Sequence, residues 1–571
     1  VMTIYDPACG SGGMLTESQN FIKDAAGVIR AAGDVYLYGK EINDETYAIC
    51  KSDMMIKGNN PANIRAGSTL STDEFAGDRF DFMLSNPPYG KSWASEQKHI
   101  KDGQEIIDPR FKVRLRDYWG ETVEADAAPR SSDGQLLFLM EMVSKMKDRA
   151  GSPAGSRIAS VHNGSSLFTG DAGGGESNIR RRLIENDLLE AIIQLPNNLF
   201  YNTGITTYIW LLSNNKPAHR QGKVQLIDAS HLYRKLRKNL GAKNCEFAPA
   251  HIQEIVDVYL AMESRERGAD DEGIAAQVFE NAEFGYYKVT IERPDRRKAR
   301  FDADRIETLR FDRVLREPME WIYRQWGDAV CESGTLADNQ KAILDWCEKN
   351  ELSLNLKNRK KLLNPEVWRK HWDLVRTAEM LMADIGEEEF DDFNGFQKRV
   401  DKALKARKIK LSPPDKKAIL NAVSWYDEGA ARVIRKKERL SGDKLSALLD
   451  HLGCGEADLP DFGYYPTEKK GEYLTYEPCS DLRDFESVPL RDDIHRYFRA
   501  EVKPHVAEAW INLDSVKIGC EISFNKYFYR HKPLRAMEEV AADIVALEQQ
   551  SEGLIADILG IEVADVSGVE S

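Results

Sequence analysis

Two short segments of the chain carry the residues best suited to chemistry. Residues 6–13 read Asp-Pro-Ala-Cys-Gly-Ser-Gly-Gly, and residues 86–89 read Asn-Pro-Pro-Tyr. Each segment directly follows a short apolar run, so each is expected at the carboxyl end of a strand, where α/β sheets bind ligands. The pair therefore predicts a ligand loop and a reactive loop at one edge of a sheet.

The first segment predicts a strand, a tight turn and the start of a helix. Gly10 and Gly12 can adopt positive φ and carry no Cβ, so the backbone there can approach a ligand closely. Asp6 could accept hydrogen bonds from the ammonium of a methionine moiety, and we place Ala8 among the ligand-binding residues. No Lys-Ser/Thr pair follows the last glycine, which argues against an ATP-binding P-loop.

A second acidic residue extends this ligand site. Glu41 follows the next predicted strand, at 35–39, and lies 35 residues after Asp6. An acidic residue at that position can accept hydrogen bonds from both hydroxyls of a ribose. The loop and Glu41 together predict a nucleoside ligand, and the alternative is an ordinary turn between a strand and a helix.

The second segment predicts a stiff loop that presents hydrogen-bond acceptors. Asn86 and Pro87 each precede a proline, which restricts both to extended conformations. The Asn86 side-chain oxygen and the Pro87 carbonyl could hold the hydrogens of an aromatic amine and favour the pyramidal nitrogen that attacks a sulfonium methyl group. Tyr89 offers an aromatic face for a base rotated out of a duplex. The alternative is a proline-rich turn after a strand.

The elements that must position these segments follow from the spacing of apolar residues. Short apolar runs alternate with helical stretches through the first ~215 residues, which predicts a parallel α/β sheet. Strands are expected at 2–5, 35–39, 80–85, 157–162, 189–195 and 205–213, and helices near 13–30, 44–57, 134–149 and 176–187.

A length of 571 residues predicts several structural units. The expected units are an N-terminally truncated catalytic domain at 1–215, an extension of that domain at 216–330, a helical insertion at 331–455, an irregular or short-stranded segment at 456–532, and a partner-docking helix with a tail at 533–571. A second double proline at 412–415 follows no buried strand, and we interpret it as the start of a helix.

Composition limits the class of protein. The net charge of −14 argues against a chain that binds DNA unaided, because duplex affinity comes largely from Lys and Arg at phosphates. The eight cysteines form no Cys-x-x-Cys pair, so no metal site is expected and a reducing compartment fits. The chain contains no apolar run of about 18 residues that could span a bilayer.

These motifs resemble those of a known family. The order and spacing of the two motifs are similar to those of γ-type amino-methyltransferases, and the wider sequence resembles the methylation (M) subunit of type I restriction-modification systems. The supporting stretches are 132–139, 162–170, 178–181, 195–205 and 521–529. The resemblance implies a cytoplasmic enzyme with a Rossmann-like S-adenosylmethionine-dependent methyltransferase domain, a mostly helical C-terminal extension, and transfer of a methyl group to the N6 amine of a flipped adenine in DNA.

The resemblance also implies roles for single residues. It places cofactor contacts at Asp6, Gly10 and Glu41, and target-amine contacts at Asn86, Pro87 and Tyr89. The position that often supplies an acidic contact to the cofactor adenine is Ser68 here, which is a departure from the family. The partners it implies are double-stranded DNA, a specificity (S) subunit, a restriction (R) subunit and a second M subunit.

Two other functions remain open at this stage. Asn-Pro-Pro-Tyr also serves enzymes that methylate a glutamine amide in proteins. Because the chain begins at the first motif, without the family's helical N-terminal domain, an assembly subunit without turnover is the other alternative. Trp93 could help to hold a flipped base or could pack beneath the following helix.

Overall fold

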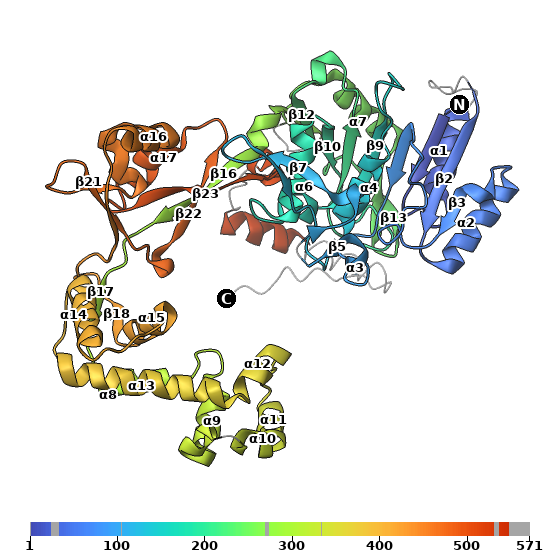
Figure 1. The fold of residues 1–571 in the computed structure, drawn as a ribbon. Helices are drawn as coiled ribbons and strands as arrows, with labels where there is room; N and C mark the ends of the chain where they lie inside the picture. Colours follow the sequence, from blue (N-terminus) through green and yellow to red (C-terminus); the bar gives the residue numbers. More distant parts are fainter. Residues whose placement is uncertain are drawn as a thin grey trace, which may run out of the picture.

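A nine-stranded sheet forms the centre of the first half of the protein (Figure 1). The computed structural model describes residues 2–23, 33–103, 105–268, 273–332, 334–529 and 536–547. The strand order is β15-β12-β10-β11-β9-β4-β1-β2-β3. The strands are β1 (Met2–Asp6), β2 (Val35–Glu41), β3 (Ile64–Ala66), β4 (Phe82–Ser85), β9 (Arg157–Asn163), β10 (Leu189–Gln194), β11 (Thr207–Ser213), β12 (Lys223–Asp228) and β15 (Ala275–Glu280).

The sheet is mixed rather than wholly parallel. β1 runs parallel to β2 and β4, and β4 runs parallel to β9. β11 runs antiparallel to both of its neighbours, and β15 runs antiparallel to β12. The predicted α/β class is confirmed, and the six predicted strands are all present. The carboxyl ends of β1, β2, β4, β9, β10 and β12 consequently share one edge of the sheet.

Helices cover both faces of this sheet. They are α1 (Gly13–Lys23), α2 (Asp44–Ile56), α4 (Gln135–Ser144), α5 (Ser165–Phe168), α6 (Gly175–Glu185) and α7 (Pro249–Ala261). Neighbouring strand residues point to opposite faces, so Tyr5 packs in the core that contains α4 and α6, while Ile4 packs in the core that contains α1 and α2. The four predicted helices are present, although 24–30 of the first lie outside the described residues.

The segment between β4 and α4 contains several small elements. They are α3 (Gln97–Ile100), β5 (Lys101–Asp102), β6 (Glu105–Ile106), β7 (Val113–Arg116) and β8 (Thr122–Ala125). A further hairpin, β13 (Arg234–Leu240) and β14 (Lys243–Glu246), follows β12. Both insertions leave the sheet at its carboxyl edge, so they border any site at that edge.

A second, smaller sheet joins segments far apart in the sequence (Figure 1). β16 (Gly285–Glu292) lies between β22 (Asp484–Pro489) and β23 (Trp510–Cys520). The end of β23 returns to the first domain, where the Arg180 Nε of α6 donates to the Cys520 carbonyl at 2.8 Å. The segment expected to be irregular or short-stranded therefore contains an eleven-residue strand.

The region between β16 and β22 is mostly helical; it includes 331–455, where a helical insertion is predicted, and also helices at 303–326, in the segment predicted to extend the catalytic domain. Its helices are α8 (Ala303–Glu307), α9 (Arg316–Trp326), α10 (Thr335–Asp338), α11 (Gln340–Lys349), α12 (Leu356–Leu362), α13 (Pro365–Ile385), α14 (Phe393–Ala406), α15 (Pro413–Ala422) and α16 (Asp443–Leu452). Short strands accompany them: β17 (Arg297–Ala299), β18 (Ser424–Tyr426), β19 (Ile434–Arg439), β20 (Tyr465–Pro466) and β21 (Glu472–Tyr476). Ser412 caps α15, so the second double proline starts a helix, as predicted.

The last elements are α17 (Ile494–Tyr497), α18 (Phe524–Phe528) and a helix at 537–547. The helix predicted from Leu534 to Leu559 is thus present where the structure describes it, and 534–535 and 548–559 lie outside the described residues. None of the helices in the described ranges is long and apolar enough to cross a membrane.

Candidate active site

A cavity of about 330 Å³ lies at the carboxyl edge of the sheet, where the loops after β1, β2 and β4 meet. Its lining includes four of the predicted site residues, namely Ala8, Glu41, Ser68 and Asn86. This volume is at the lower end of the range for small-molecule sites. The sequence thus brings the ligand loop and the reactive loop to one cavity, although they are 80 residues apart.

The two glycines of the ligand loop differ in their surroundings. Both have positive φ, 53° for Gly10 and 83° for Gly12. A Cβ on Gly12 would lie 2.8 Å from the Cys50 Sγ of α2, so this glycine is required for packing. A Cβ on Gly10 would meet nothing within 4 Å. Gly10 therefore leaves open space beside the loop, but neither glycine is among the residues that line the cavity.

Glu41 connects the loop to the second strand. One carboxylate oxygen accepts a hydrogen bond from the Gly10 N–H at 2.9 Å, and the other accepts one from the Asn43 N–H at 2.8 Å. A carboxylate offers about four acceptor positions, so each oxygen keeps capacity for a ligand hydroxyl. Glu41 consequently shapes the loop as well as facing the cavity.

Asp6 lies beneath the loop and does not line the cavity. It is 2% exposed, and its Oδ1 accepts hydrogen bonds from the Ala8 N–H at 2.9 Å and the Ser85 hydroxyl at 2.7 Å. Burial raises the pKa of Asp6 to about 7, against the lowering effect of these hydrogen bonds. Through Ser85, the last residue of β4, Asp6 also ties the ligand loop to the start of the reactive loop.

The residues of the reactive loop differ in how far they are exposed. Asn86 is exposed on the cavity, Pro87 is buried, and Tyr89 is half-buried. In the part of the chain that the structure describes, the Asn86 side chain makes no hydrogen bond. Burial raises the pKa of Tyr89, so its hydroxyl stays protonated in the physiological range. Neither Pro87 nor Tyr89 is among the residues that line the cavity.

A buried polar network holds the end of the reactive loop. The two motifs did not predict it. Asp133 accepts from the Gly90 N–H at 3.0 Å, and its other oxygen accepts from the Gln135 amide at 2.7 Å and the Ser165 hydroxyl at 2.9 Å. The Gln135 amide also donates to Asn163 at 2.7 Å. The loop after β4 is thereby fixed to the ends of β9 and to the starts of α4 and α5.

The sequence contained one signal for this network. Residues 132–135 and 162–166 are polar and sit next to apolar runs, and both stretches belong to the family resemblance. His162 extends the network, since its Nδ1 lies 3.1 Å from the Gln135 side-chain oxygen. Burial lowers the pKa of His162 to about 3, so its imidazole is neutral in the physiological range.

Ser68, which follows β3, and Trp93, which follows β4, also line the cavity. Ser68 is half-buried, and no acidic side chain occupies its position. Trp93 is 3% exposed, and its indole N–H donates to the Arg130 carbonyl at 3.0 Å. A Cβ on Gly134 would lie 3.1 Å from the Trp93 ring, so the indole packs against the start of α4. Of the two roles left open for Trp93, packing is the one that the structure shows.

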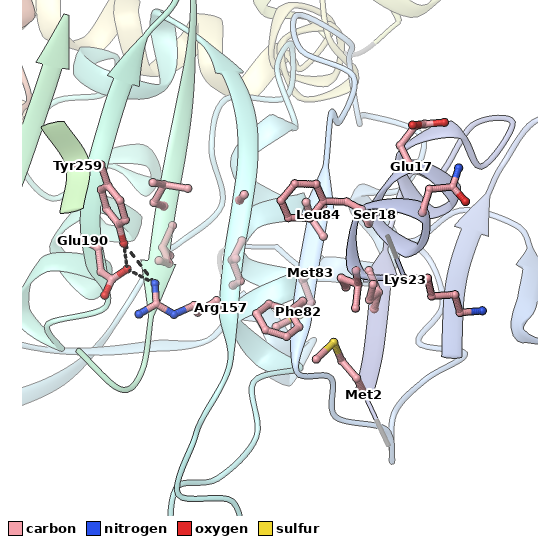
Figure 2. Close-up of a pocket in the computed structure, with 18 residues that line it drawn as sticks. Met2, Glu17, Ser18, Lys23, Phe82, Met83, Leu84, Arg157, Glu190 and Tyr259 are labelled. Carbon is pink, nitrogen blue, oxygen red and sulfur yellow. Dashed lines mark hydrogen bonds and ion pairs between the residues drawn. The ribbon is translucent and has the colours of Figure 1, made fainter. Parts of the chain in front are cut away.

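A larger groove, of about 1160 Å³, lies on a face of the sheet between α1 and α7 (Figure 2). Its walls are mostly apolar strand residues such as Phe82 and Leu84. Its main polar group is an ion pair between Arg157 and Glu190 at 3.0 Å, and Tyr259 donates to Glu190 at 2.7 Å. No predicted site residue lines this groove. The smaller cavity at the carboxyl edge is therefore the better candidate active site.

The fold and the cavity together define an α/β protein whose ligand loop and Asn-Pro-Pro-Tyr loop share one site. Comparison with known families shows to which family the chain belongs. The model of the N-6 DNA Methylase family matches residues 1–294, which is more than half of the chain. The chain therefore belongs to the N-6 DNA methylase family.

Individual relatives are methylase subunits of type I restriction enzymes. The chain is 31% identical over 264 residues to the MjaVII methylase subunit of Methanocaldococcus jannaschii, covering 45% of this chain and 40% of the relative. It is 30% identical over 232 residues to the HindI methylase subunit of Haemophilus influenzae, covering 40% and 45%. The matches thus span less than half of these relatives.

Among solved structures, the type I restriction-modification methyltransferase subunit from Streptococcus thermophilus is 26% identical, with a TM-score of 0.38. The match covers 49% of this chain and 50% of that one.

Proposed function

We propose that this chain transfers a methyl group from S-adenosylmethionine to the N6 amine of an adenine rotated out of DNA, as the modification subunit of a type I restriction-modification complex. The observation that carries the proposal is that Asn86 lines the same cavity as Ala8 and Glu41. Family membership and the names of the relatives support it.

The ligand loop fits a nucleoside that carries an amino acid. The open space at Gly10 admits a ligand against the backbone, and the Glu41 oxygens retain acceptor capacity for ribose hydroxyls. The carboxylate of Asp6 lies below the loop, where an ammonium group would favour its ionised form. When bound, S-adenosylmethionine supplies a sulfonium methyl group as the electrophile.

The reactive loop holds the target amine. The side-chain oxygen of Asn86 and the carbonyl of Pro87 accept the two N–H bonds of the amine, which directs its nitrogen lone pair out of the plane of the base. Asn86 has no competing hydrogen bond within the described structure, so it need not break one to bind substrate. Tyr89 supplies the face on which the base stacks. No protein nucleophile is needed.

The proposed partners are double-stranded DNA, a specificity subunit, a restriction subunit and a second copy of the modification subunit. The net charge of −14 is the reason to expect that other chains contribute DNA affinity. The helix at 537–547 exposes an apolar row that would suit a docking role: Met537 at 83%, Val540 at 39%, Ile544 at 58% and Leu547 at 64%.

Methyl transfer from tritiated S-adenosylmethionine to plasmid DNA tests the proposal. The chain is assayed alone and with its specificity subunit, with Asn86→Ala as the inactive control. We expect label in DNA with the wild-type complex and not with Asn86→Ala. Label in protein rather than DNA would favour a glutamine-amide methyltransferase, and no label under any condition would favour an assembly subunit without turnover.

A further inference from the structure

The β13–β14 hairpin is a strongly basic surface element on the same edge of the sheet as the candidate active site. Residues 234–246 contain five Lys and Arg residues and one acid, in a chain whose net charge is −14. We infer that this hairpin binds the phosphate backbone of the DNA beside the flipped base. The inference rests on the proposed function for the identity of the substrate, and adds the surface that holds it.

The charges of the hairpin are available to a ligand. Its one acid, Glu246, forms an ion pair with Arg234 at 2.7 Å. In the described part of the chain, Lys235, Arg237 and Lys238 are exposed and have no acidic partner. Along a strand, Lys235 and Arg237 are about 6.8 Å apart, the axial rise of two nucleotides of one DNA strand. Lys235 and Arg237, on one face of the strand, can therefore contact phosphates two nucleotides apart, and Lys238 adds a third cation on the other face.

The hairpin is anchored rather than projecting freely. Asn198 donates from its side chain to the Ala242 carbonyl at 3.0 Å, and the Lys243 Nζ donates to the Leu199 carbonyl at 3.1 Å. A Cβ on Gly241 would lie 2.6 Å from the Tyr201 carbonyl, so the tip of the hairpin packs tightly on the loop after β10. An anchored hairpin can hold a ligand in a fixed register.

The hairpin lies on the same edge of the sheet as the reactive loop. It follows β12, and Asn86 follows β4; both strands end at the carboxyl edge. Four strand spacings separate them in the strand order, which is about 19 Å. In Figure 1, β13 lies on the same side of the domain as α3 and β5, which follow the reactive loop. A duplex whose base reaches Asn86 would pass over this hairpin.

The surroundings of the hairpin favour a nucleic acid over an acidic protein surface. A groove of about 1190 Å³ between the hairpin and the loop after β10 is lined largely by amides and hydroxyls, including Asn197, Asn239, Asn244 and Ser230. Such groups bind phosphate and sugar oxygens. Tyr201, against which the hairpin packs, is 63% exposed, and the Lys243 Nζ lies 5.4 Å from its ring centre. Exposed aromatic rings among cations are typical of nucleic-acid surfaces.

The test compares the full chain with a triple variant, Lys235→Gln, Arg237→Gln and Lys238→Gln, each in complex with the specificity subunit. The matched control replaces three exposed lysines of α14, Lys398→Gln, Lys402→Gln and Lys405→Gln. Binding of a fluorescent duplex is measured by anisotropy between 50 and 200 mM salt. We expect the slope of log K against log salt to fall by about 2.7 in the hairpin variant, and affinity near 150 mM to fall on the order of a hundred-fold. The control should keep the wild-type slope.

Two further measurements separate the possible outcomes. Lys235→Arg with Lys238→Arg keeps the charges and should bind like wild type, which excludes misfolding as the cause. An unchanged slope in the hairpin variant, loss of the specificity subunit instead of DNA, or absence of duplex binding by wild type would overturn the inference. Methyl transfer is read separately: hairpin-dependent binding without transfer to DNA would contradict the proposed function alone.

Discussion

The backbone N–H of Gly90, the residue after Asn-Pro-Pro-Tyr, donates a hydrogen bond of 3.0 Å to the Oδ1 of Asp133. Asp133 is itself held by Gln135 and Ser165, so the position of the reactive loop depends on residues more than 40 positions further along the chain. The residues of the reactive loop and the residues that position this loop therefore come from different parts of the sequence.

Asp133→Asn should therefore reduce turnover without reducing cofactor affinity. The amide keeps one acceptor for Gly90, but its NH₂ group would face the donors of Gln135 and Ser165, and the loop would shift. A displacement near 1 Å can cost about a hundred-fold in rate. Steady-state kinetics and calorimetry check this, with the exposed Asp78→Asn as the matched control. Unchanged turnover would contradict the positioning role.

The two loop glycines should respond differently to alanine. Gly12→Ala should destabilise the protein by about 2–4 kcal/mol, because a left-handed residue carries a strain of 1–2 kcal/mol and the Cβ overlaps Cys50. Gly10→Ala carries only the strain and should instead weaken cofactor binding. Thermal unfolding and calorimetry separate the effects, with Gly58→Ala as a positive-φ control away from the cavity. Equal effects at both positions would show that the loop does not contact the cofactor.

The pH dependence of stability should reflect Asp6. Its folded pKa of about 7 is raised above the ordinary value of 3.8, because burial favours the neutral acid. This contribution to stability is complete below pH ~4 and is lost as the pH rises through about 7, amounting to about 4 kcal/mol at 1.36 kcal/mol per unit. Asp6→Asn should remove this loss of stability. The melting temperature of the variant should therefore rise relative to that of wild type between pH 5 and 8. Parallel curves would contradict the burial effect.

Cofactor affinity should depend on the same carboxyl group. An ammonium group binds ionised Asp6 better than protonated Asp6, so affinity should increase from pH 5 to pH 7 and level off above pH 7. Calorimetry of wild type and Asp6→Asn across this range measures the effect. A pH-independent affinity in wild type would contradict an effect of the Asp6 charge on the cofactor.

Glu41→Gln should weaken cofactor binding about tenfold or more. The carboxylate accepts from both Gly10 and Asn43, and an amide in its place would turn a donor toward one of these N–H groups. Calorimetry checks this against Glu45→Gln, an exposed carboxylate in the first turn of α2. Equal affinity of the two variants would contradict the assignment of Glu41.

Local patterns predicted the sheet and its motifs because each motif directly follows an apolar strand. The six predicted strands are short stretches rich in apolar residues, and the turns after β1 and β4 are marked by glycine or proline. These features depend on residues close together in the sequence, so periodicity and turn chemistry detect them.

Features that depend on distant contacts could not be predicted in this way. The pairing partner of β23, β16, lies more than 200 residues earlier in the chain. The direction of β11 and the three-residue β3 are set by their neighbours in the sheet. Asp6 was expected to face the ligand directly, and only the structure shows its hydrogen bond to Ser85.

The central claim is that the amine held by Asn86 is the N6 amine of adenine. DNA methylated by the complex in the presence of S-adenosylmethionine is digested to nucleosides and analysed by mass spectrometry, with Asn86→Ala as the control. The proposed function predicts N6-methyladenine with wild type and none with Asn86→Ala, while calorimetry shows that the variant still binds the cofactor. N4-methylcytosine as the only product, or N6-methyladenine at an equal level with Asn86→Ala, would contradict it.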